Sequence, residues 1–133
     1  MNILISYKEI IEQVAKKFIV NPAIKAIDEK TVEVSYKPAS LFLSISVRFH
    51  IESAHNDLIC MTYDCSPATA VIVSGLVAQF ENRIPSQLEV NTTEKRVSIY
   101  PRRFEKLEKV LEYVSLSDII FEQEAVNVQL TAI

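Results

Sequence analysis

Apolar and polar residues alternate most regularly between Leu41 and Ile51. The odd-numbered positions of this segment are all apolar, whereas the even positions from 44 to 50 are polar. A period of two is typical of a strand that buries one face. A polar turn over 53–57 leads to a second apolar run over 58–64, and so short a connection favours an antiparallel hairpin.

Three other segments share a common order of short apolar strand, polar turn and alternating strand. They are IKAIDEKTVEVSY (24–36), LEVNTTEKRVSIY (88–100) and IIFEQEAVNVQL (119–130). Their spacing is too irregular for a solenoid repeat, and hairpin chemistry alone generates such a pattern. We therefore expect three more hairpins in an antiparallel sheet with helices on one face.

The segment from Ser66 to Pro85 predicts a helix. Ser66 suits the N-cap, and Pro67 suits the first helical position, where a backbone N–H would have no partner. No charge occurs between Pro67 and Phe80, so we expect this helix to be mostly buried and Leu76→Glu to abolish folding. Gly75, the only glycine, costs about 1 kcal/mol relative to alanine at mid-helix and indicates a close approach by another group.

Two further helices are expected from apolar residues at three- and four-residue spacing. The first covers 5–20, begins with a capping box formed by Ser6 and Glu9, and ends at Asn21-Pro22. The second covers 102–114 and has a charged outer face. The predicted fold class is therefore α+β: one domain over 1–133, in which a curved antiparallel sheet of hairpins wraps around a long central helix, with two further amphipathic helices.

Charge and hydrophobicity limit the kinds of partner that we expect for this protein. The 133 residues carry a net charge of -3, which provides no basic surface for nucleic acid. The longest uncharged run is shorter than the roughly 20 apolar residues of a membrane span. The first residues lack the basic and continuous apolar regions of a signal peptide, so we expect a cytoplasmic protein.

Catalytic and metal-binding motifs are not recognised. His50, His55, Cys60 and Cys65 fall within sixteen residues, but no CxxC or HxxxH pair occurs, so we expect no metal site and no cofactor. Cys65 precedes the Ser66 helix, where the helix dipole favours a thiolate, yet no histidine is placed to act as its base. The sequence therefore indicates a protein that is not an enzyme.

A basic group follows the predicted hairpin over 88–100. Arg102, Arg103, Lys106 and Lys109 would suit an anionic headgroup or membrane surface, but glutamates are interleaved with them. A charged outer helix face is the commoner explanation, and the role of this group stays open.

Two apolar surfaces remain: the odd face of 41–51 and the bulky face of the 66–84 helix. They either fill each other as an ordinary core or leave a groove for an apolar ligand. The segments VSYKPASLFLSISVRFHIES, DLICMTYDC, SPATAVIVSGLVAQF and SDIIFEQEAVNVQL together resemble, in cadence, the tubular lipid-binding superfamily of bactericidal/permeability-increasing protein domains. Members of that superfamily hold lipids between a helix and a curved sheet.

This resemblance implies a small binding protein for an apolar or lipid-like ligand, without catalysis. The alternative is a structural or protein-interaction module with a solidly packed core, for which a homodimer is one form. The residues expected to line the groove are Leu43, Ile45, Val47, Phe49, Val73, Leu76, Val77 and Phe80.

Overall fold

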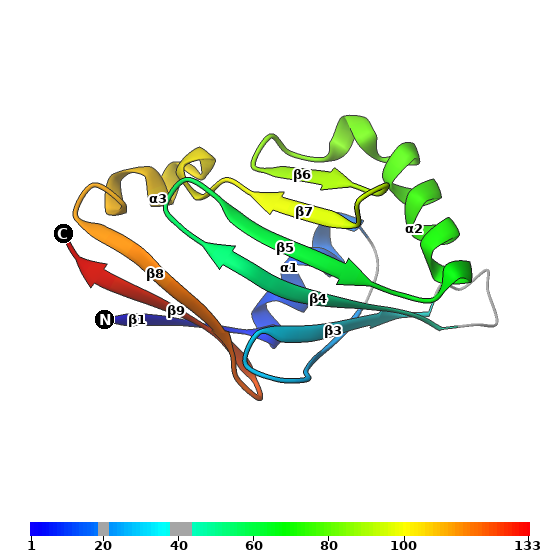
Figure 1. Cartoon of the computed structure of the whole chain (residues 1–133), viewed down its shortest axis with the longest axis horizontal. Helices are drawn as coiled ribbons and strands as arrows, with labels where there is room; N and C mark the ends of the chain where they lie inside the picture. Colours follow the sequence, from blue (N-terminus) through cyan, green and yellow to red (C-terminus); the bar gives the residue numbers. More distant parts are fainter. Residues whose placement is uncertain (19–21, 38–43) are drawn as a thin grey trace.

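A computed structural model describes residues 1–18, 22–37 and 44–133. These residues are mostly β, arranged as two antiparallel sheets with three α-helices around them (Figure 1). The larger sheet has six strands. In spatial order they are β2 (Ala23–Ala26), β3 (Thr31–Tyr36), β4 (Ile45–Ala54), β5 (Ile59–Asp64), β7 (Arg96–Ile99) and β6 (Leu88–Asn91).

The smaller sheet has three strands and joins the two ends of the chain. Its spatial order is β1 (Asn2–Ser6), β9 (Ala125–Ala132) and β8 (Val114–Phe121). The helices are α1 (Tyr7–Phe18), α2 (Pro67–Gln79) and α3 (Glu105–Val110), with 3-10 turns η1 (Glu81–Arg83) and η2 (Pro101–Arg103).

The predicted hairpins are confirmed. β4 pairs with β5, and the three similar segments form the antiparallel pairs β2–β3, β6–β7 and β8–β9. Along β4 the odd positions from Ile45 to Ile51 are buried or half-buried and the even positions are exposed, as the alternation predicts. Residues 41–43 lie outside the described part of the chain.

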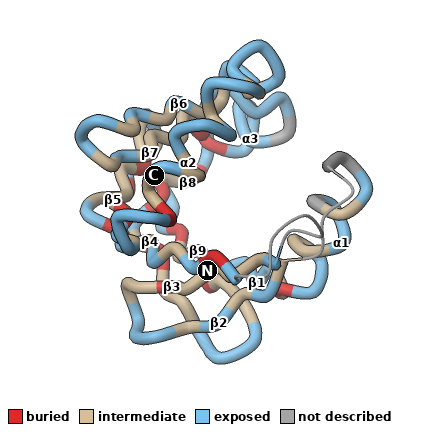
Figure 2. The backbone as a smooth tube through the Cα atoms, turned by 90° about the vertical axis from the view of Figure 1, so that its right-hand side faces the viewer, coloured by how far each residue is buried: buried red, intermediate tan, exposed pale blue. Residues whose placement is uncertain are grey.

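The core lies where the two sheets meet. β4 and β8 are in contact, and buried side chains from both sheets, including Ile59 at the start of β5, form one cluster (Figure 2). Each of the two strands carries a bulge beside this contact, between Ile51 and Ser53 and between Leu116 and Asp118. A bulge bends its strand locally, which allows one sheet to turn against the other. The cluster comprises Ile51, Ala54, Ile59, Val114, Leu116, Ile119 and Leu130.

The turn between β2 and β3 fastens the two sheets together. Phe121 donates its backbone N–H to the Glu29 carbonyl at 2.8 Å. The Lys30 ammonium donates to the Ile119 carbonyl at 2.9 Å and forms an ion pair with Asp118. The same turn reaches the larger sheet, because Ile51 donates its backbone N–H to the Lys30 carbonyl at 2.8 Å. One turn therefore bonds to both sheets.

The predicted fold class is wrong in its central element. Within the described residues no long helix is wrapped by a sheet: α2 ends at Gln79 and lies at one end of the larger sheet (Figure 1). Ser66 caps it as predicted, since its Oγ accepts from the Thr69 N–H at 3.2 Å. Thr69 is its one buried residue, however, whereas Val71 is 74% exposed. An absence of charge was therefore no sign of burial here.

The expectation of close packing at Gly75 is also wrong. A Cβ placed on Gly75 would meet nothing within 4 Å, so the close approach expected at this glycine does not occur among the described residues. The other two predicted helices are also shorter than expected. Residues 5 and 6, the predicted start of the first helix, belong to β1, and Val114 begins β8, because its apolar side chain fits a strand as well as the helical spacing.

The exposure of Leu76 changes the expected effect of Leu76→Glu on stability. Leu76 is 38% exposed, so Leu76→Glu should cost less than about 1 kcal/mol. Leu116 belongs to the core, and Leu116→Ala should cost about 2–5 kcal/mol. Urea unfolding of both variants measures these costs. Similar losses in the two variants would contradict the observed positions of α2 and β8.

The ion pair between the sheets gives stability a pH dependence. The Lys30 ammonium, which donates to the Asp118 carboxylate, holds the pKa of that carboxyl below its usual 3.8. A lowered folded-state pKa contributes stability that is complete above the unfolded pKa, and this contribution is lost as pH falls through the folded pKa. The free energy of unfolding should therefore drop more steeply below about pH 4 in the wild type than in Asp118→Asn. Parallel pH profiles would show that the ion pair contributes nothing.

Candidate functional site

The most enclosed apolar space among the cavities identified in the described residues lies beneath α3. It has a volume of about 210 Å³, and all of its lining side chains are apolar. They come from both sheets, from η2, and from α3 and the residue that follows it. The lining residues are Ile3, Ile5, Ile59, Pro101, Leu107, Val110, Leu111, Leu116, Ile119, Val128 and Leu130.

One face of the smaller sheet forms the floor of this cavity. The register places Val128 opposite both Ile3 of β1 and Ile119 of β8. Leu130 lies opposite Leu116, two positions further along β9. Because directly paired residues in a sheet project from the same face, these side chains form a continuous apolar surface. The floor of the cavity is therefore formed by the apolar residues that face the same side of β1, β9 and β8.

The segment η2–α3 forms the cover. Leu111, immediately after α3, is only 4% exposed and anchors this segment to the core. Arg102 reaches the β4–β5 turn, where its Nε lies 2.6 Å from a carboxylate oxygen of Asp57. In the same turn the Asn56 Oδ1 accepts from the Leu116 N–H at 2.6 Å. The β4–β5 turn thus contacts both the cover and the floor.

The cavity has an apolar mouth. Ile3, Ile5, Leu107 and Val110 line it and are each more than a third exposed. These exposed fractions indicate that the cavity opens beside these four side chains. An apolar molecule could therefore enter between β1 and α3 without displacing a polar group.

The residues predicted to line a groove lie elsewhere. Leu43 is outside the described residues. On β4, Ile45 is buried and Val47 and Phe49 are half-buried, with the Phe49 ring centroid 6.0 Å from that of Tyr63. On α2, Val73 and Val77 are half-buried, as is Phe80 at its C-cap, while Leu76 is exposed. α2 contacts β4, but the cavity beneath α3 is lined by other residues.

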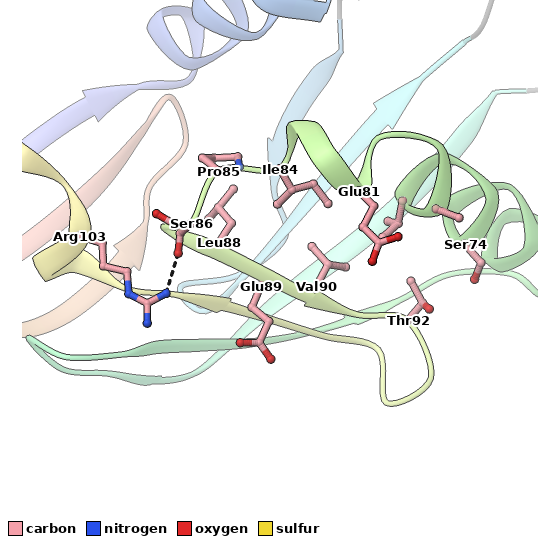
Figure 3. A pocket seen from close by; sticks show the side chains of 12 residues that line it. Ser74, Glu81, Ile84, Pro85, Ser86, Leu88, Glu89, Val90, Thr92 and Arg103 are labelled. Atoms are coloured by element: carbon pink, nitrogen blue, oxygen red, sulfur yellow. Dashed lines mark hydrogen bonds between the residues drawn. The ribbon is translucent and has the colours of Figure 1, made fainter.

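Val77 lines a different, open hollow of about 510 Å³ between α2 and β6 (Figure 3). Apolar residues such as Ile84 and Leu88 share its lining with charged Glu81, Glu89 and Arg103. The hollow therefore stays accessible to water, and it offers an apolar ligand less than the cavity beneath α3.

The basic group found in the sequence is partly engaged in contacts within the chain. Arg103 lies over the Tyr100 ring, 4.0 Å from its centroid, and its Nη1 donates to the Ser86 carbonyl at 2.8 Å (Figure 3). The Tyr100 hydroxyl donates to Glu89 at 2.9 Å, and this hydrogen bond raises the pKa of the tyrosine. Arg102 and Arg103 thus hold neighbouring segments together, which explains two of the four basic positions.

The histidines and cysteines do not form a cluster. His50 shares a hydrogen bond of 2.9 Å with the Thr31 hydroxyl, and Cys60 and Cys65 are half-buried free thiols. Among the described residues, no group of three or more His, Cys, Asp or Glu side chains is placed to hold a metal ion. Cys65 lines an open polar hollow that also contains Arg48 and Asp64.

Comparisons with known proteins found no matching family model, no matching curated protein and no matching solved structure. The resemblance to tubular lipid-binding domains therefore stays a prediction. None of the described helices combines the length and apolar character that crossing a bilayer requires.

Proposed function

We propose that this protein binds an apolar molecule, without catalysing a reaction, in the cavity beneath α3. The observation that carries the proposal is the lining: eleven apolar side chains surround the space, and the mouth is also apolar. Such a site binds by removing apolar surface from water, which contributes roughly 25 cal/mol per Å². It rejects charged or strongly polar molecules, because nothing in the lining replaces their hydrogen bonds to water.

The volume limits the ligand. Apolar cavities of about 150 Å³ accept benzene, whereas sites for drug-sized molecules begin near 300 Å³. A cavity of about 210 Å³ therefore fits one aromatic ring or a short acyl segment. The remainder of a longer lipid would have to lie outside the mouth, along Ile3, Ile5 and Leu107. We therefore retain the apolar ligand predicted from the sequence, but we place it beneath α3 instead of between α2 and the larger sheet.

The alternative function, a protein-interaction module, is favoured by a different observation. α2 carries no charged residue, and its Val71 is 74% exposed. An uncharged helix with exposed apolar side chains gains free energy when a partner covers it.

Toluene provides a direct test of the cavity. Titration should shift the methyl NMR signals of Ile3, Leu107 and Val128, with a dissociation constant of about 0.1–1 mM, as expected for a ligand of this size. Val110→Phe adds volume at the mouth and should weaken toluene binding at least tenfold.

Val71→Phe is the matched control, because it makes the same substitution on α2, away from the cavity lining. It should bind toluene as the wild type does. The proposal fails if wild-type methyl signals do not respond to toluene, or if Val110→Phe and Val71→Phe bind it equally well.

A further inference from the structure

β1 has one unpaired edge within the described residues. The smaller sheet runs in the order β1-β9-β8, so β1 pairs with β9 on one side and ends the sheet on the other. An exposed strand edge presents a row of N–H and C=O groups that can pair with another strand.

The hydrogen bonds at the two ends of β1 show which groups face outward. Leu130 donates its backbone N–H to the Met1 carbonyl at 2.8 Å, and Tyr7 donates to the Glu124 carbonyl at 3.0 Å. In an antiparallel pair, hydrogen-bonded positions alternate along each strand. The odd residues of β1 therefore bond to β9, and the backbone groups of Asn2, Leu4 and Ser6 point to the free edge.

This edge lacks the usual protection against pairing. Between Asn2 and Ser6 the chain contains no charged residue and no proline, which are the residues that normally block an exposed edge. Leu4 is 59% exposed, and Ile3 and Ile5 are also exposed. Burial of these side chains would favour association.

The solvent-accessible surface of the chain also favours association with a partner. The chain exposes 9108 Å², whereas a compact monomer of 15.1 kDa is expected to expose about 7,100 Å². The excess of about 2,000 Å² is larger than the roughly 800 Å² that each partner buries in a protein interface of standard size.

We propose that the protein forms a homodimer in which β1 pairs antiparallel with β1 of a second copy. The strand is self-complementary in one register: Leu4 lies opposite Leu4 of the partner subunit, and Asn2 lies opposite Ser6 of the partner subunit. In this register the outward backbone groups of Asn2, Leu4 and Ser6 face one another. The two three-stranded sheets then become one continuous sheet across a twofold axis.

The same register affects the cavity mouth. Ile3 lies opposite Ile5 of the partner subunit, on the face that lines the cavity beneath α3. The partner subunit's Ile5 therefore extends the apolar surface beside the mouth. The proposed dimer does not require a bound ligand.

Disulfide cross-linking tests the register. Residues in a hydrogen-bonded antiparallel pair have Cα atoms about 5.5 Å apart, which suits a disulfide. Leu4→Cys, in a background with Cys60→Ser and Cys65→Ser, should form a covalent dimer on mild oxidation. Asn2→Cys is the control, since its copies would lie about 14 Å apart, four strand positions away from each other. Equal cross-linking of both variants, or none of Leu4→Cys, would overturn the register.

Sedimentation tests the dimer without added cysteines. The wild type should have twice the 15.1 kDa mass of the chain at micromolar concentration. Leu4→Pro removes an outward N–H and leaves the bonds to β9 intact, so it should raise the dimer dissociation constant at least tenfold without unfolding the chain. A wild type that stays monomeric at 100 µM would overturn the inference. Because toluene binding is measured separately, this result would leave the proposed function standing.

Discussion

The structure depends on the contact between its two sheets. Ile51 and Ile59 of the larger sheet pack with Leu116, Ile119 and Leu130 of the smaller one, and this is the buried cluster of the described chain. Both β4 and β8 are bulged beside the contact, and the β2–β3 turn bonds to both sheets. Stability is therefore concentrated at one junction, while α2 lies at the far end of the larger sheet (Figure 1) and both α1 and α2 leave much of their surface exposed.

The cavity follows from this junction. Leu116, Ile119 and Leu130 belong to the core cluster and also line the cavity, so the floor is part of the packed core. The cover is different: α3 has six residues, and Leu107 and Val110 remain exposed at the mouth. A well-packed apolar floor beneath a short, partly exposed helix suits a site that admits a ligand by a small movement of its cover.

Local patterns in the sequence predicted the local structure well. The period-two segments became the four expected hairpins, and Ser66 caps α2. The errors concern what pairs or packs over long sequence distances. β1 pairs with β9 across the whole chain, which no local period reveals. The absence of charge predicts that α2 is buried in the core, whereas the larger sheet packs there against the smaller one. The cavity was missed for the same reason, since β1 and α3 meet only in the fold.

Xenon binding is the most direct test of whether the space beneath α3 accepts an apolar guest. Xenon is apolar and small enough to enter a cavity of about 210 Å³ without a change in the fold. A crystal under xenon pressure should show a xenon atom between Leu107 of α3 and Val128 of β9. An empty cavity under these conditions, with xenon bound elsewhere or not at all, would contradict the account.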